Sequence, residues 1–182
     1  MNHLSTAILS AIAALLMLAA TSCGRGKDYT PIQASSQSCT IAVRCVAHDG
    51  SDLLDNKKIA DGITLEGRSS NTRLKYELRT INGHKCIVFE ADIPDRNDMR
   101  WTYDRREASG ISKVALKIDR QRLDLECALK YIANRPPAAA GGSLTLEQVT
   151  LKGHTFKKSG GMVSVTLHFD ENIKLLNPVA QH

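Results

Sequence analysis

Apolar and polar residues alternate with a period of two through most of the chain after residue 39, and this pattern constrains the fold more than any other feature. The stretches CTIAVRCVA (39–47), RLDLECALKYI (122–132) and GMVSVTLHF (161–169) each place their apolar side chains on one face. Such alternation is typical of half-buried β-strands. No segment carries an apolar stripe at helical spacing over three turns. The sequence therefore predicts an all-β fold.

Turn signals divide the alternating region into hairpins. Asn82-Gly83 is the strongest short hairpin signal. A polar turn near Arg120 and the run Ser159-Gly160-Gly161 mark two more. The apolar parity slips between Leu146 and Val149, which predicts a β-bulge. About seven short strands in one domain, residues 39–182, are typical of an antiparallel, immunoglobulin-like β-sandwich, and this is the expected architecture.

The first residues resemble a bacterial lipoprotein leader. The apolar run at 7–20 is too short to span a bilayer, which takes about 20 residues, but has the length of a signal-peptide core. It ends in LAATSC, which resembles a lipobox, and this implies cleavage after residue 22 and acylation, including palmitate, of Cys23. Residues 23–38 then read as the lipidated cysteine and a polar tether. Gly24 in place of Asp implies the outer membrane, on its periplasmic or its cell-surface face.

The remaining four cysteines predict disulfide bonds. An even number of cysteines in an exported chain is typical of a disulfide framework, and the spacing contains no C-x-x-C pair of the kind that binds zinc. Three pairings are open, and the alternative is four reduced cysteines buried as small apolar groups. The candidates are Cys39, Cys45, Cys86 and Cys127.

The acidic segment HDGSDLLDNKK (48–58) has two interpretations. Asp49, Asp52 and Asp55 would supply carboxylates to a calcium ion, which needs six to eight oxygen ligands. The segment lacks the ligand spacing and the closing Glu of an EF-hand loop. The other interpretation is a structural turn whose leucines, 53 and 54, cover one end of the domain.

The leader and this segment together resemble a group of small lipoproteins common in Bacteroidetes. In that group a D-x-x-G-x-D-L-L-D type loop follows the first strand of a β-rich domain. Here the matching residues read DGSDLLD (49–55), with the aspartate and glycine adjacent rather than spaced. The resemblance covers the leader and a short stretch after it. It implies a place in the cell envelope and no established activity.

The segment DMRWTYDRRE (98–107) holds the only tryptophan and is the candidate ligand site. Trp101 and Tyr103 on a loop would stack on a sugar ring, with Arg100 and Arg105 bonding hydroxyls or carboxylates. The alternative is that both aromatic rings pack inward at a strand edge, as large aromatic side chains usually do.

Catalytic motifs are absent from the sequence. It contains no G-x-S-x-G, H-E-x-x-H or glycine-rich phosphate loop. Asp92, Asp95 and Asp98 would be the carboxylates of a hydrolase acting on envelope glycans, but they fall in a stretch that reads as a solvated loop. The net charge of +5 comes from scattered basic residues, which argues against nucleic acid. We expect a non-catalytic binding or structural module without a cofactor, with a protein or glycan partner in the envelope.

Overall fold

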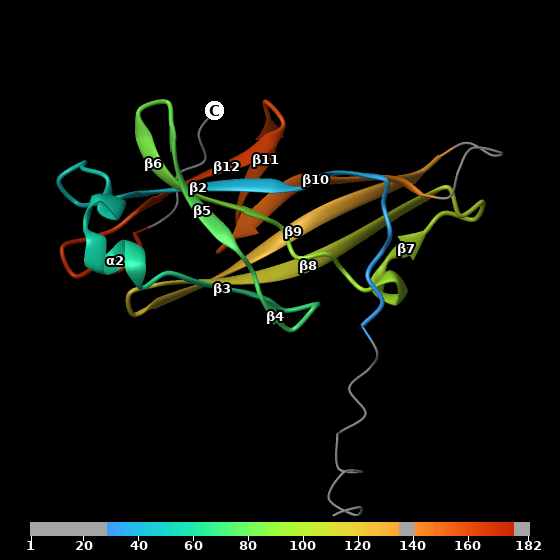
Figure 1. The fold of residues 1–182 in the computed structure, drawn as a ribbon, viewed down its shortest axis with the longest axis horizontal. Helices are drawn as coiled ribbons and strands as arrows, with labels where there is room; N and C mark the ends of the chain where they lie inside the picture. The colour runs from blue at the N-terminus through green and yellow to red at the C-terminus, as the bar shows by residue number, and fades with distance from the viewer. Residues whose placement is uncertain (1–28, 135–140, 177–182) are drawn as a thin grey trace, which may run out of the picture.

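A computed structural model describes residues 29–134 and 141–176. The fold is all-β: one mixed sheet of twelve strands curls into a half-barrel and encloses the core (Figure 1). The predicted signal peptide and Cys23 lie outside the described residues. Within the described ranges, no helix is long and apolar enough to cross a membrane.

The sheet path runs β4-β3-β8-β9-β10-β11-β12-β2-β6-β5, with β1 added beside β10 and β7 beside β8. Three short helical turns, η1 (Leu53–Asp55), α2 (Lys57–Asp61) and η2 (Arg96–Asp98), join strands. The strands are β1 (Ser36–Ser38), β2 (Thr40–Val46), β3 (Thr64–Gly67), β4 (Thr72–Arg73), β5 (Tyr76–Ile81), β6 (His84–Glu90), β7 (Arg100–Trp101), β8 (Glu107–Ile118), β9 (Gln121–Ala133), β10 (Gly142–Leu151), β11 (His154–Ser159) and β12 (Met162–His168).

The long β8–β9 hairpin forms the middle of the sheet, as the turn near Arg120 predicted. Its pairing runs from Ile118 opposite Gln121 to Glu107 opposite Ile132. Alternate residues of β9, from Leu123 to Tyr131, are buried in the core. The next strand, β10, shifts its register between Leu146 and Gln148, which confirms the predicted bulge.

The other two predicted turns also form. Asn82 and Gly83 both have positive φ, 52° and 82°, and join β5 to β6 as a type I′ turn requires. Gly160 and Gly161 join β11 to β12. The sequence did not predict a further turn, at Lys152-Gly153, where φ is 48° and 82°. This turn divides the expected single strand before Ser159 into β10 and β11.

The prediction of a seven-stranded, antiparallel, immunoglobulin-like sandwich is corrected by the topology. Strand β2 pairs with β12 in parallel, and β1 pairs with β10 in parallel. The two ends of the sheet path, β4 and β5, follow one another in the chain. Alternation shows which side chains point inward but not which distant strands pair, so the sequence could indicate strands without revealing a single curled sheet.

The predicted disulfide bonds are also corrected, because all four described cysteines are free and buried. Cys45 belongs to the core inside the curl, whereas Cys86 belongs to a small cluster with Ala42 and Val88 on the opposite face of the same strands. Their side chains therefore point away from each other. The Cys39 thiol lies 3.6 Å from the Leu144 carbonyl oxygen, to which it donates. The alternative of reduced, buried cysteines matches the structure.

Residues 29–38 are attached to the domain rather than forming part of a free tether. The Arg96 amide donates to the Thr30 carbonyl at 2.8 Å, and the Ser35 amide donates to the Gly142 carbonyl at 2.8 Å. Strand β1 then runs along β10. The part of the predicted tether before residue 29 lies outside the described residues.

Candidate binding site around Trp101

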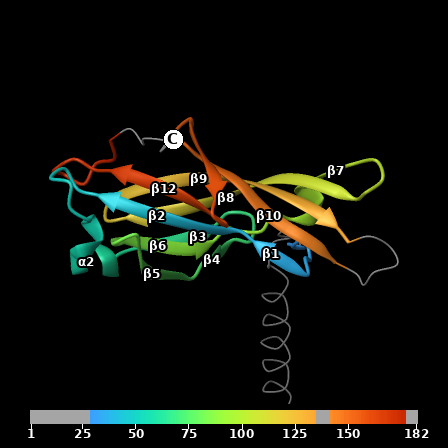
Figure 2. The ribbon, with the colours of Figure 1, turned by 90° about the horizontal axis from the view of Figure 1, so that it is seen from above.

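The segment after β6 builds the site at the end of the molecule opposite α2 (Figure 2). Asp95 caps η2, because its carboxylate accepts the Asn97 amide at 2.8 Å. Strand β7 follows and pairs with the start of β8, Trp101 opposite Ala108. A capped turn and a strand thus fix the backbone on both sides of Met99, which is buried.

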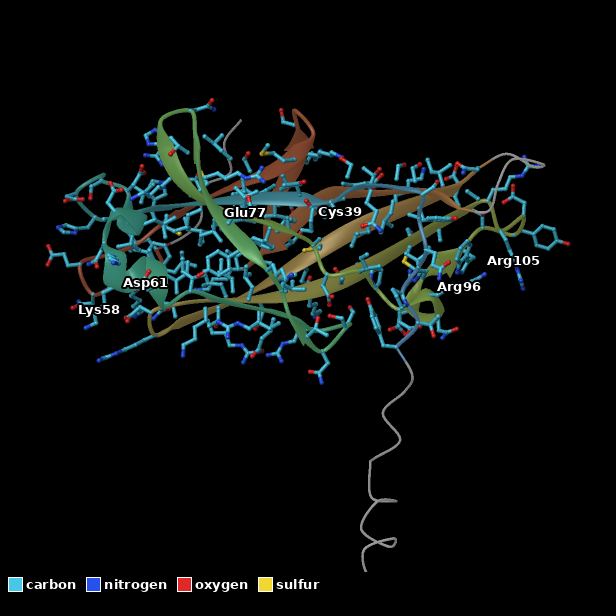
Figure 3. All side chains as sticks on the ribbon, viewed as in Figure 1. Cys39, Lys58, Asp61, Glu77, Arg96 and Arg105 are labelled. Atoms are coloured by element: carbon cyan, nitrogen blue, oxygen red, sulfur yellow. The ribbon has the colours of Figure 1, made fainter. Side chains whose placement is uncertain are left out.

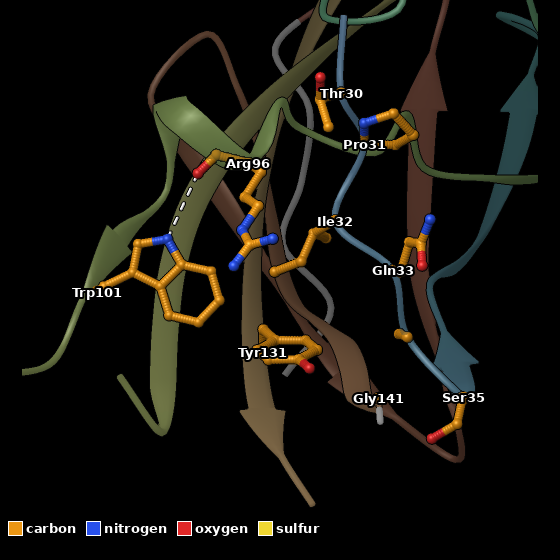
Figure 4. A pocket seen from close by; sticks show the side chains of 10 residues that line it. Thr30, Pro31, Ile32, Gln33, Ser35, Arg96, Trp101, Tyr131 and Gly141 are labelled. Carbon is orange, nitrogen blue, oxygen red and sulfur yellow. Dashed lines mark hydrogen bonds between the residues drawn. The ribbon is translucent and has the colours of Figure 1, made fainter. Parts of the chain in front are cut away.

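Trp101 is partly buried and held in place by three contacts. Its indole N–H donates to the Arg96 carbonyl oxygen at 3.4 Å (Figure 4). Its ring meets Tyr131 edge to face, with centroids 5.6 Å apart. The Arg96 guanidinium lies over the indole, 5.6 Å from the ring centroid. The alternative of inward packing therefore matches the structure in part: one edge packs against the core while the ring still lines the surface.

Two hollows meet at Trp101 and share Arg96. The first has a volume of about 530 Å³ and lies between Trp101, Tyr131 and the docked segment 30–35 (Figure 4). The second has a volume of about 380 Å³ and is lined by Arg96, Asn97, Met99, Trp101 and Arg105. Both volumes fall in the range of small-molecule sites, roughly 300–1,000 Å³.

The lining of both hollows is basic. It contains Arg96 and Arg105 and no carboxylate. Neither arginine forms an ion pair with another residue in the described ranges. Both side chains lie at the same end of the molecule (Figure 3). Unpaired guanidinium groups in a concave surface favour an anionic ligand.

A partly exposed indole flanked by arginines is suited to binding. Comparisons with protein-family models, curated proteins and solved structures found no match. The side chains that line the hollows therefore indicate the class of ligand.

The structure brings together only part of the predicted ligand set. Trp101 and Arg105 line the second hollow together. Arg100 lines a different hollow, with Lys130 and Glu107. Tyr103 is fully exposed, at 106 %, and lines neither of the Trp101 hollows. Its neighbour Asp104 is engaged within its own loop, because its carboxylate accepts the Thr102 hydroxyl at 2.7 Å and the Arg106 amide at 3.1 Å.

Three components of the site were missed at the level of sequence. Tyr131 read only as an inward position of a strand, Arg96 as part of a loop, and residues 30–35 as tether. The N-terminal segment reaches the site because Pro31 forms an isolated antiparallel β-bridge with Asp95. No local pattern signals a contact between segments so far apart in the chain.

The acidic segment 48–58 docks onto basic groups of the neighbouring strands. The Arg44 Nε donates to Asp52 Oδ1 at 3.0 Å, and the Lys85 amide donates to Asp52 Oδ2 at 3.2 Å. His84 Nδ1 lies 3.2 Å from the same Oδ2. Burial acts to raise the pKa of Asp52, but these hydrogen bonds outweigh it and hold the pKa below its usual value. The carboxylate therefore ties the turn to β2 and β6.

The three candidate calcium ligands have separate partners. Asp49 accepts the Ser51 hydroxyl at 2.6 Å, and Asp55 pairs with the Lys85 ammonium at 2.7 Å. No group of three or more His, Cys, Asp or Glu that could hold a metal ion occurs in the described ranges. Leu54 is buried and Leu53 packs against the core, as the structural-turn interpretation predicted. The geometry favours that interpretation.

We expect the change of Asp52 to Asn to lower the free energy of unfolding at pH 7 by about 1–2 kcal/mol, because it weakens a charge-assisted hydrogen bond to Arg44. A carboxyl whose pKa is lower in the folded state stabilises above its unfolded pKa, near 3.9, and loses this effect as the pH falls through the folded pKa. Urea titrations from pH 7 to pH 3 should show a smaller acid loss in the variant than in the wild type.

Thermal melts of the wild type and of Asp52→Asn, in EDTA and in millimolar calcium, test the calcium interpretation. We expect the melting temperature to stay within about 1 °C, since the carboxylates are not gathered. A rise of several degrees with calcium that disappears in Asp52→Asn would instead restore the calcium site.

The stretch 92–98 is not a solvated loop throughout, which corrects the expectation for the three hydrolase carboxylates. Asp92 is 3 % exposed and Asp95 is 5 % exposed, whereas Asp98 is exposed on η2. Asp92 accepts the amides of Ser69 and Ser70, at 2.7 and 3.1 Å. Asp95 accepts the Thr30 amide at 2.8 Å. Both buried carboxylates thus anchor backbone segments.

Proposed function

We propose that the protein is a lipid-anchored lipoprotein of the bacterial outer membrane, of the small kind that it resembles in Bacteroidetes. Its β domain is a non-catalytic module that binds an envelope component, a glycan or a protein, in the hollows around Trp101. The observation that carries the binding role is the partly exposed Trp101, which lies between two hollows that share Arg96 and contain no carboxylate.

The docked N-terminal segment supports a binding role close to a membrane. Six positions separate the predicted lipidated Cys23 from Tyr29, whose hydroxyl donates to the Ile93 carbonyl at 2.8 Å. A chain of that length spans about 20 Å at most. Residues 30–35 line one side of the first hollow. Anchored at Cys23, the domain would therefore hold this hollow within reach of membrane-attached glycans and proteins.

The binding role is tested with residues 24–182, which contain every described element, immobilised and exposed to detergent-solubilised envelope of the source bacterium. We expect the wild type to retain an envelope component at least ten times better than Trp101→Ala, because the indole is shared by both hollows. Mass spectrometry and sugar analysis identify what is retained.

The matched control is Tyr103→Ala, which removes an exposed aromatic side chain that lines neither hollow. It should retain the component as the wild type does. A circular dichroism melt shows whether Trp101→Ala is folded, and Arg96→Gln serves as a second variant that leaves the indole in place. Equal retention by the wild type and both hollow variants would contradict the proposal.

The anchor is tested on the full chain. We expect wild-type cells to incorporate labelled palmitate into the protein and to carry it in the outer-membrane fraction, because the lipobox ends at Cys23. Cys23→Ser should abolish the label and move the protein out of that fraction. Unlabelled wild-type protein, or label that persists in the variant, would show that Cys23 is not the lipidated residue.

A further inference from the structure

Trp101 is a rigid platform between two hollows. The Arg96 carbonyl takes up the indole N–H, and the Tyr131 ring fixes the edge of the indole. The Arg96 guanidinium lies over the indole, so Trp101 presents to a ligand the ring surface that Arg96 leaves open, and not its hydrogen-bond donor. A flat apolar surface held in one orientation suits the apolar face of a sugar ring, which loses little freedom on packing there.

Each hollow adds the same two kinds of polar group to this platform. Arg96 serves both hollows, and Arg105 adds a second guanidinium to one of them. Gln33 lines the first hollow and Asn97 the second. The side-chain amides of Gln33 and Asn97 form no hydrogen bond with another residue in the described ranges. A carboxamide can donate to and accept from hydroxyl groups.

The charge of the site selects among saccharides. A guanidinium binds a carboxylate or phosphate through two parallel hydrogen bonds, and these are stronger than bonds between neutral groups. With no carboxylate in either lining, Arg96 and Arg105 lack a counter-charge inside the hollows. A neutral sugar would leave both guanidinium groups unmatched, whereas an acidic sugar would pair with them.

We propose that the two hollows are adjoining subsites for an acidic oligosaccharide, one of whose sugar rings packs against Trp101 beside Arg96 and whose acidic group pairs with Arg96. This proposal rests on the binding role proposed above and names the class of ligand. The hollows would hold neighbouring sugar units of one chain, because they share Trp101 and Arg96.

The single tryptophan makes the test direct, since Trp101 fluorescence reports on the hollows alone. Residues 24–182 are titrated with tetragalacturonate and with its neutral methyl ester, and with maltotetraose phosphate and maltotetraose. We expect at least one acidic probe to change the fluorescence and to bind at least ten times more tightly than its neutral counterpart. Which acidic probe binds distinguishes a carboxylate from a phosphate.

Arg96→Gln and Arg100→Gln form the matched pair of variants. Arg100 lies on the same strand as Trp101 but lines a different hollow. We expect Arg96→Gln to weaken binding of the acidic probe at least ten-fold and Arg100→Gln to change it less than two-fold. Raising the salt from 50 to 500 mM should weaken the wild type more than Arg96→Gln, because salt screens the guanidinium charge.

Several outcomes would overturn the proposal. They are equal binding of acidic and neutral probes, equal effects of the two arginine variants, binding of polyglutamate as tight as that of the saccharide, and no fluorescence change with any saccharide. If the saccharide titrations fail but retention of an envelope component still depends on Trp101, only the proposal of an acidic saccharide ligand is rejected. Failure of both experiments would remove the binding role as well.

Discussion

Replacing Asp92 with alanine is expected to lower the free energy of unfolding by about 3 kcal/mol, because it leaves two backbone donors without their acceptor. Asp92 is 3 % exposed, and its Oδ2 accepts the amides of Ser69 and Ser70 in the turn between β3 and β4. Gly67 permits this approach, since a Cβ there would lie 2.5 Å from the Asp92 carboxyl carbon. The carboxylate thus holds the β3–β4 turn against the end of β6.

Urea denaturation at pH 7 measures the loss of free energy of unfolding. A thermal melt should show a fall in melting temperature of roughly 6–12 °C for a domain of this size. Asp92→Asn should lose about half as much, because an amide oxygen still accepts a hydrogen bond. Asp124→Ala, at an exposed position on β9, is the control and should change the stability by less than about 0.5 kcal/mol. An alanine variant as stable as this control would show that water replaces the carboxylate.

The pair of Asp92 variants also separates an anchoring role from a catalytic one. A general acid or base loses its proton-transfer chemistry in Asn and in Ala alike. If Asp92 is an anchor, the two variants should differ in their free energy of unfolding, because Asn keeps an acceptor oxygen and Ala does not. Hydrolysis of envelope glycans by the wild type that Asp92→Asn abolishes without loss of stability would favour the hydrolase hypothesis.

The all-β fold was predictable because half-buried strands carry their own signal. The inward positions of β12, from Val163 to Leu167, and of β2, from Ile41 to Cys45, alternate as their sequences indicate and are buried. The turns at Asn82-Gly83 and Gly160-Gly161 are equally local, since positive φ favours glycine and asparagine. The sheet topology was not predictable in this way. The parallel pairing of β2 with β12 joins residues more than a hundred positions apart, and no local feature encodes it.

The candidate site was predictable only where it is local. Trp101 and Arg105 lie in one segment of the sequence, and the structure places both in the lining of one hollow. The same proximity placed Arg100 in the predicted set, but neighbouring residues of a strand point to opposite faces and Arg100 lines a different hollow. Arg96 and Tyr131 belong to the site because η2 and β9 meet there. Contacts of this kind follow from the sheet topology, so they could not be predicted from the sequence when the topology could not.

The second large effect is expected at alkaline pH and comes from Cys127. This thiol is fully buried, and burial raises its pKa from 9.0 to about 12. Between these values the unfolded chain releases the proton while the folded chain keeps it. The folded state then binds more protons, so stability falls as the pH rises. The loss due to this thiol should be about 1 kcal/mol at pH 10 and about 2–3 kcal/mol at pH 11.

Cys127→Ala should therefore be less stable than the wild type at pH 7, by about 1–2 kcal/mol for the small cavity, and equal to it or more stable at pH 11. Urea titrations with reductant at pH 7–11 measure both. The control is Val149→Ala, which opens a cavity opposite Cys127 and should lower stability at every pH without changing the slope. Parallel curves for the wild type and Cys127→Ala would contradict the raised pKa.

Repeating the titration without reductant tests whether Cys127 forms a disulfide, because a cysteine in a disulfide has no proton to release. If Cys127 is a free thiol, its share of the alkaline loss stays the same with and without reductant.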